Sequence, residues 1–109
     1  MIRIAVTPQS THDVYQLLVQ KERELRSKKS GTLHRRGSAR AGKARWAHSS
    51  FPGRILLQRC LGGVCVAVIK STTPNDQWQL LSSFIGFLDR HFRQQISGVT
   101  LTYVIAGKK

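Results

Sequence analysis

The segment RILLQRCLGGVCVAVIK, residues 54 to 70, is the feature that most constrains the fold. It contains two aliphatic runs separated by Gly62 and Gly63. Two adjacent glycines accept the positive φ angles that a two-residue hairpin turn requires. We therefore expect an antiparallel hairpin in which Cys60 faces Cys65. In this register the core-facing side carries a set of apolar residues: Ile55, Leu57, Leu61, Val64, Val66 and Val68.

Both ends of the chain carry the alternating apolar pattern of a half-buried strand. Ile2, Ile4 and Val6 alternate with more polar or smaller residues and predict a strand over residues 2 to 7, which Pro8 ends. The stretch VTLTYVI, residues 99 to 105, predicts the last strand.

Two segments have the spacing of three and four residues that indicates an amphipathic helix. The first covers residues 11 to 27 and follows Ser10, the expected N-cap. The second covers about residues 75 to 94, with Thr73 as its cap and Pro74 at its start. The predicted core combines the stripe of the second helix with strand residues: Trp78, Leu81, Phe84, Ile85, Leu88 and Phe92 against Ile4, Leu57, Val66, Val68 and Leu101.

The elements follow the order strand, helix, strand, strand, helix, strand. This order predicts an α+β protein with the ferredoxin-like βαββαβ plait, in which two helices cover one face of a four-stranded antiparallel sheet. RNA-recognition domains, several ribosomal proteins and many small-molecule sensors share this topology, so it does not assign a function. A chain of 109 residues is expected to form a single domain, because a second core would bury too little surface.

Residues 28 to 50 lack an apolar period and are expected to form a long basic loop or mobile arm between the first helix and the second strand. The formal net charge of the whole chain is +13, and much of it is concentrated in one region. Residues 26 to 59 contain ten Lys and Arg residues and no acid. Such a concentration of like charge favours an anionic partner. All the acids fall in the segments predicted as helices: Asp13, Glu22, Glu24, Asp76 and Asp89.

The sequence therefore favours a small nucleic-acid-binding protein over an enzyme. RNA or single strands are expected rather than a defined duplex DNA site, because neither predicted helix carries the residues of a major-groove reader. Trp46 has two alternative roles, stacking on an unpaired base or packing on the sheet with Phe51. The expected nucleic-acid contacts are Lys28, Lys29, Arg35, Arg36, Arg40, Lys43, Arg45, Trp46 and Arg54.

Two alternatives stay open at this point. An RNA-cleaving toxin or metal-independent nuclease would use His34 or His48 as its base or acid. A dimeric protein-interaction or sensor domain would use the uncovered face of the sheet, either for a homodimer or for another partner. That face is expected to carry Arg3, Leu56, Ile69, Thr100 and Thr102.

The sequence predicts neither a metal site nor a cofactor, because Cys60 and Cys65 lack partners at zinc-ligand spacing and the carboxylates are not clustered. A cytoplasmic protein without a membrane partner is expected. Two cysteines are too few for a disulfide-stapled secreted fold. The N-terminal apolar run is too short for a signal peptide, and no stretch approaches the length of a membrane span.

Overall fold

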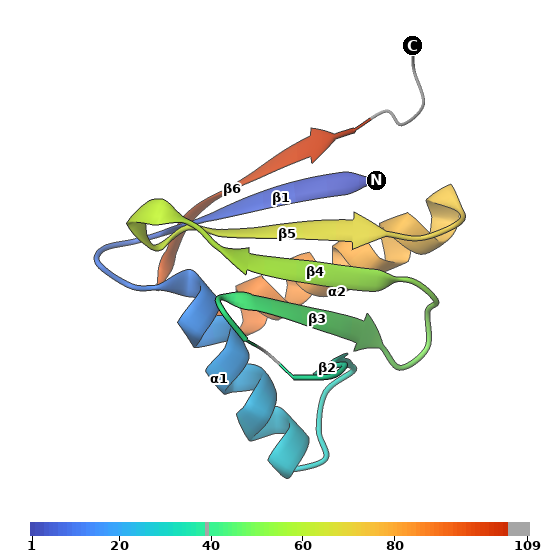
Figure 1. Cartoon of the computed structure of the whole chain (residues 1–109), viewed down its shortest axis with the longest axis horizontal. Helices are drawn as coiled ribbons and strands as arrows, with labels where there is room; N and C mark the ends of the chain where they lie inside the picture. Colours follow the sequence, from blue (N-terminus) through green and yellow to red (C-terminus); the bar gives the residue numbers. More distant parts are fainter. Residues whose placement is uncertain (39, 105–109) are drawn as a thin grey trace.

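The sheet is antiparallel and has six strands over the described residues, so the predicted α+β class is confirmed and the predicted number of four strands is wrong. The structure is a computed structural model that describes residues 1–38 and 40–104. The strand order across the sheet is β2-β3-β4-β5-β1-β6 (Figure 1). The elements are β1 Ile2–Pro8, α1 Val14–Ser27, β2 Leu33–Arg35, β3 Lys43–His48, β4 Arg54–Arg59, a 3-10 turn Leu61–Gly63, β5 Cys65–Lys70, α2 Pro74–Phe92 and β6 Ile96–Tyr103.

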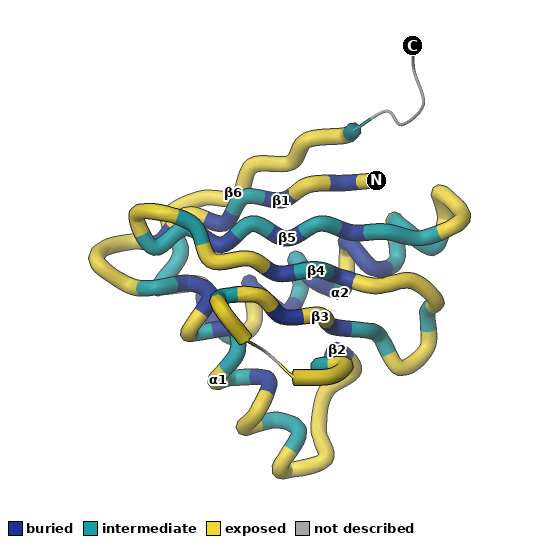
Figure 2. Tube along the Cα trace, viewed as in Figure 1, coloured by how far each residue is buried: buried dark blue, intermediate teal, exposed yellow. Residues whose placement is uncertain are grey.

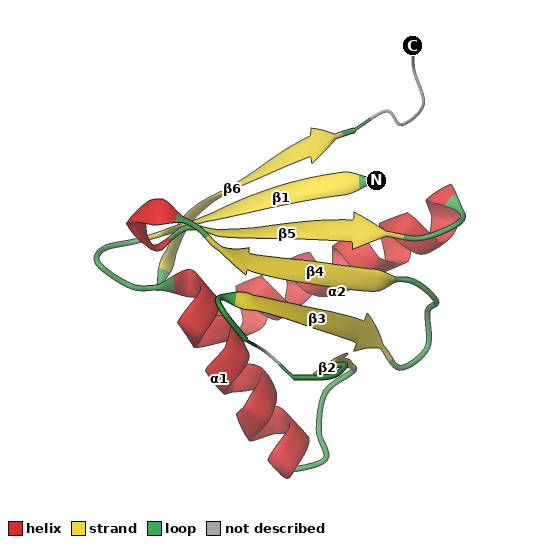
Figure 3. Ribbon diagram, in the orientation of Figure 1, coloured by secondary structure: helices red, strands yellow, loops and turns green. Residues whose placement is uncertain are grey.

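The two unexpected strands come from the basic segment that the sequence predicted to be a loop or mobile arm. β2 pairs with β3, and β3 pairs with β4, so this hairpin extends the sheet at its β4 side (Figure 3). Ala44 and Trp46 of β3 are buried, whereas Lys43 and Arg45 are exposed. The segment therefore has the period of two that defines a strand. Only three described residues of the segment are buried, Leu33, Ala44 and Trp46, which is why the pattern is inconspicuous in the sequence.

The hairpin between β4 and β5 has a different register from the predicted one. The N–H of Cys60 donates to the carbonyl oxygen of Val64 at 2.8 Å, so the turn contains three residues, and Arg59 lies opposite Cys65. A shift of one residue moves every side chain of a strand to the other face. Cys65, Ala67 and Ile69 are therefore buried in place of the expected valines. Both cysteines are free thiols.

Both helices pack against the same face of the sheet. Tyr15 of α1 lies under the guanidinium of Arg59, and Phe84 of α2 contacts Trp46 with its ring. Asp13 caps α1 by accepting a hydrogen bond from the N–H of Gln16 at 3.3 Å, so the expected cap at Ser10 is wrong.

The second helix begins as predicted. The hydroxyl of Thr73 accepts from the N–H of Asp76 at 3.1 Å, and Pro74 is the first helical residue. The buried face is rotated from the expected one, because Trp78 is 58% exposed and other residues take its place. The buried residues of α2 are Leu80, Leu81, Phe84, Phe87, Leu88 and Phe92.

The opposite face of the sheet is turned toward the viewer in Figure 1, with α2 behind it. Its central residues are half-buried and its flanking residues are exposed, whereas alternate residues of β1, β3, β4 and β5 are buried toward the helices (Figure 2). We call this surface the open face. It is formed by Arg3, Ala5, Lys43, Arg45, Arg54, Leu56, Gln58, Val66, Val68, Lys70, Thr100 and Thr102.

The turn glycines provide a direct test of the observed hairpin. Gly62 and Gly63 both have φ near +75°, at +73° and +77°, but a Cβ on Gly63 would collide with the carbonyl oxygen of His12, whereas a Cβ on Gly62 would meet nothing within 4 Å. Each alanine carries the cost of a positive φ. We expect Gly63→Ala to lower the free energy of unfolding by a further ~1 to 3 kcal/mol, the range for overpacking. Urea unfolding of both variants measures this difference, and equal stability of the two would contradict the observed turn.

Candidate nucleic-acid interface

Cross-strand pairing places a row of side chains across five strands of the open face. Arg45 lies opposite Leu56, and Leu56 lies opposite Val68. Val68 lies opposite Arg3, which pairs in turn with Thr102 of β6. Two cations therefore flank an aliphatic centre. Because neighbouring strands are ~4.8 Å apart, the backbones at Arg45 and Arg3 are ~14 Å apart.

A hollow of about 700 Å³ opens at the β3 side of this face. Leu56, Val66 and Val68 form its apolar floor. The turn between β2 and β3, with the adjoining ends of both strands, provides its basic wall. We call the four cations that line the hollow the wall cations: Arg36, Arg40, Lys43 and Arg45.

The backbone under the wall cations is held by hydrogen bonds. The N–H of Arg36 donates to the carbonyl of Arg45 at 2.7 Å. Arg40 and Lys43 exchange two hydrogen bonds of 3.0 Å. The N–H of Arg59 donates to the carbonyl of Gly42 at 2.7 Å and ties the turn to the end of β4. The wall cations thus extend from ordered backbone, and less conformational entropy is lost when they bind a ligand than would be lost by a free arm.

The acidic residues are separated from this surface. Four acids form ion pairs on the helical side: Glu24 with Lys21, Glu22 with Arg26, Asp13 with Arg59 and Asp89 with Arg93. The fifth acid, Asp76, accepts from the hydroxyl of its cap residue at the start of α2. None of the wall cations forms an ion pair with a described residue. The open face therefore carries positive charge that no neighbouring carboxylate neutralises.

The remaining predicted cations lie elsewhere. Arg54 is exposed on the open face, where it lies directly opposite Lys70 of β5 in the strand register. Lys28 and Lys29 are exposed just after α1 and do not line the hollow. Arg35 is half-buried opposite Trp46, on the edge strand. Of the predicted set, the structure thus brings the wall cations together around one hollow, and Arg54 adds to the same face.

Sequence reasoning missed part of this surface. Val66 and Val68 were assigned to the core because the expected turn was one residue too short, and for the same reason Ile69 was expected on the open face although it is buried. Lys70 was not recognised as a neighbour of Arg54. The expected positions of Leu56 and Arg3 on the open face are confirmed by their pairing.

Trp46 is 1% exposed and belongs to the core. Its ring meets those of Phe84 and Phe87 edge-to-face, at centroid distances of 6.3 and 5.3 Å. Of the two roles left open by the sequence, the structure shows packing, although the partner is α2 and not Phe51, which lies against His48. In this position the ring of Trp46 offers almost no surface to a base, so Trp46 is not included in the proposed interface.

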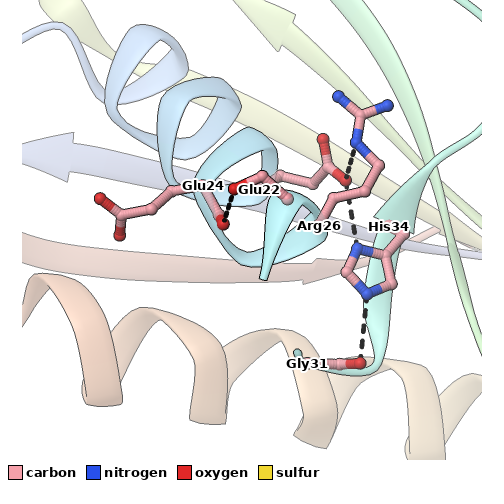
Figure 4. A network of polar contacts seen from close by, with 6 residues as sticks. Glu22, Glu24, Arg26, Gly31 and His34 are labelled. Carbon is pink, nitrogen blue, oxygen red and sulfur yellow. Dashed lines mark hydrogen bonds and ion pairs between the residues drawn. The ribbon is translucent and has the colours of Figure 1, made fainter. Parts of the chain in front are cut away.

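His34 joins the hairpin to α1 (Figure 4). Its Nε2 lies 3.1 Å from the carbonyl oxygen of Gly31, which can only accept, so Nε2 donates. Its Nδ1 lies 3.1 Å from Oε2 of Glu22, a side chain that is 2% exposed and also contacts Nε of Arg26 at 3.4 Å. Both ring nitrogens of His34 thus have partners within the protein, which indicates a structural role.

His48 has a separate set of partners. Its Nδ1 accepts a hydrogen bond from the N–H of Ser50 at 2.9 Å, and its ring lies 4.6 Å from that of Phe51. Burial lowers the pKa of His48, which favours the neutral ring that can accept this bond. The two histidines therefore share no partner that would hold them at one phosphate group. This arrangement gives no support to catalysis by His34 or His48.

In the described part of the chain, no group of three or more His, Cys, Asp or Glu side chains is placed to bind a metal ion. Neither of the two described helices combines the length and the apolar character needed to cross a membrane.

Comparison with family models, curated proteins and solved structures found no match to this chain. The geometry and charge of the open face are therefore the basis on which a function is assigned.

Replacing each tryptophan with alanine tests whether the β2–β3 hairpin packs against α2. Trp46→Ala is expected to lower the free energy of unfolding by ~3 to 5 kcal/mol, as for other buried aromatic residues. Trp78→Ala is expected to change it by less than ~1 kcal/mol, because Trp78 lies at the surface. Urea unfolding measures both. If Trp46→Ala unfolded like the unchanged protein and instead lost affinity for single-stranded nucleic acid, the assignment of Trp46 to the core would be wrong.

Proposed function

We propose that the protein binds nucleic acid through the open face and that RNA or single-stranded DNA is favoured over a specific duplex DNA site. The observation that carries this proposal is the hollow itself. It combines an aliphatic floor with four wall cations that have no acidic partner in the described residues. A nucleic acid matches both parts of this surface, because its phosphates are negatively charged and the faces of its bases can contact apolar side chains.

The wall cations would bind phosphate groups. Lys43 and Arg45 point to the same face of β3, two residues and ~7 Å apart. Arg36 and Arg40 approach from the turn. Arg3 and Arg54 carry the positive charge across the remaining strands. Contacts of this kind release counterions, so the affinity should fall steeply with salt.

The floor of the hollow would contact a base. Leu56, Val66 and Val68 offer apolar surface, but no aromatic side chain belongs to the open face as the described residues form it. The face therefore lacks the stacking platforms that usually give sequence-specific readout of single strands. We expect binding with little base preference.

The position of the helices favours single strands over duplex DNA. Reading a duplex through its major groove commonly requires a helix or a two-stranded ribbon that enters the groove. Both α1 and α2 pack on the other side of the sheet, and neither contributes a residue to the lining of the hollow (Figure 3). The bases of a single strand are unpaired and accessible, so they can reach the floor of the hollow.

Salt-dependent binding with matched variants tests this function. In the face variant, Arg36, Arg40, Lys43 and Arg45 are changed to glutamine. Binding of short single-stranded RNA, single-stranded DNA and duplex DNA is measured across a salt series. The slope of log affinity against log salt is expected to become less steep by up to ~3 for single strands, since each lost phosphate contact removes ~0.7.

A control variant carries the same change in charge on the helical side, with Lys21, Arg23, Arg90 and Arg93 changed to glutamine. Each variant removes four cations, so each lowers the formal net charge from +13 to +9. The proposal predicts a near-normal slope for the control variant. Equal slopes for the two variants would show that binding follows overall charge and not the open face.

A further inference from the structure

The outer edge of β6 has no partner strand among the described residues, since β6 lies at one end of the sheet order (Figure 1). Natural proteins usually protect a long edge strand with charged residues, prolines or bulges. β6 has eight residues and none of them is charged or proline, and the irregularity in its pairing with β1 lies at its beginning, before residue 98. The uncharged stretch extends from residue 94 to residue 107, in a chain with a formal net charge of +13.

The backbone of β6 presents three residues to this edge. Met1 and Val104 exchange hydrogen bonds of 3.0 and 3.3 Å, so the backbone groups of Val104 point toward β1. In an antiparallel pair, hydrogen-bonded and non-hydrogen-bonded positions alternate. The N–H and carbonyl groups of Val99, Leu101 and Tyr103 therefore point away from β1.

The side chains of the same three residues are also exposed. Val99 is 40% exposed, Leu101 is 42% exposed and Tyr103 is 67% exposed, although they lie on the helical side of the sheet. The β1 residues opposite Leu101 and Tyr103, Ile4 and Ile2, are buried. The same three residues thus have outward-facing backbone groups without a partner strand among the described residues and exposed apolar side chains. A neighbouring strand would pair the backbone groups and cover the side chains.

We propose that β6 pairs antiparallel with β6 of a second copy of this chain, around a two-fold axis at Leu101. Leu101 then faces Leu101 of the other copy, and Val99 faces Tyr103. Every outward backbone group of these residues finds a partner, and the exposed apolar side chains form cross-strand pairs. A second copy is the partner because the pattern is symmetric about Leu101. The lack of charge also allows two strongly basic chains to approach here without direct repulsion.

Pairing at this edge would join the two sheets into one. Thr100 and Thr102 would continue the open face across the two-fold axis, with Thr100 of one copy opposite Thr102 of the other. The two β1 backbones on either side of the axis would be ~14 Å apart, three strand spacings, and Arg3 of one copy would lie in the same row as Ala5 of the other. The dimer goes beyond the proposed function and does not depend on it, because it needs only the edge of β6.

Sedimentation equilibrium without nucleic acid tests the dimer. The unchanged protein is expected to have the mass of two chains. Leu101→Lys places two ammonium groups opposite each other at the axis and is expected to reduce the mass to that of one chain. Leu61→Lys adds the same charge at a side chain that is 95% exposed in the β4–β5 turn, and it should leave the dimer unchanged.

A disulfide provides a second test that does not depend on a destabilising charge. In a Cys60→Ser background, Leu101→Cys would place two thiols at a directly opposed pair with a Cα separation of ~5.5 Å, within the range for a disulfide. Mild oxidation is expected to give a covalent dimer of this variant. Thr100→Cys should give none, because residue 100 faces residue 102. A single-chain mass for the unchanged protein, a dimer that survives Leu101→Lys, or equal cross-linking of both cysteine variants would overturn the proposal.

Discussion

Burial of Trp46 against α2 determines where the positive charge of this protein appears. Successive residues of a strand point to opposite faces, so a tryptophan fixed between Phe84 and Phe87 forces Arg45 and Lys43 outward. The same contact converts a segment rich in Gly, Ser and Lys or Arg into a strand of the sheet. Without it, the wall cations would belong to a flexible chain and would lose more entropy on binding.

The separation of charge between the two sides of the sheet follows from the same arrangement. The few carboxylates stabilise helix ends and pair with nearby cations, and buried Glu22, which pairs with Arg26 on the same helix, connects α1 to the hairpin through His34 (Figure 4). The hairpin cations have no such neighbours in the described residues. Their mutual repulsion reduces the stability of the free protein, and an anionic ligand would offset that repulsion.

Local signals were sufficient for much of the fold. The cap at Thr73 and Pro74 defined the start of α2, and the alternation of Ile2, Ile4 and Val6 defined β1. The register of β5 was not predictable, because Gly62 and Gly63 fit either a two-residue or a three-residue turn. Tertiary contacts decide between them by placing Cys65, Ala67 and Ile69 in the core.

The candidate site could also be predicted only in part, because its geometry depends on the strand register. The wall cations could be named from composition, but their convergence on Leu56, Val66 and Val68 required the strand pairing. An NMR titration of the protein with a short single-stranded oligonucleotide tests the central claim most directly. The open-face interface predicts that amide shifts change in β3, β4, β5 and the β2–β3 turn, while those of the exposed residues of α1 and α2 stay constant. Changes confined to the helices, or no change at low salt, would contradict it.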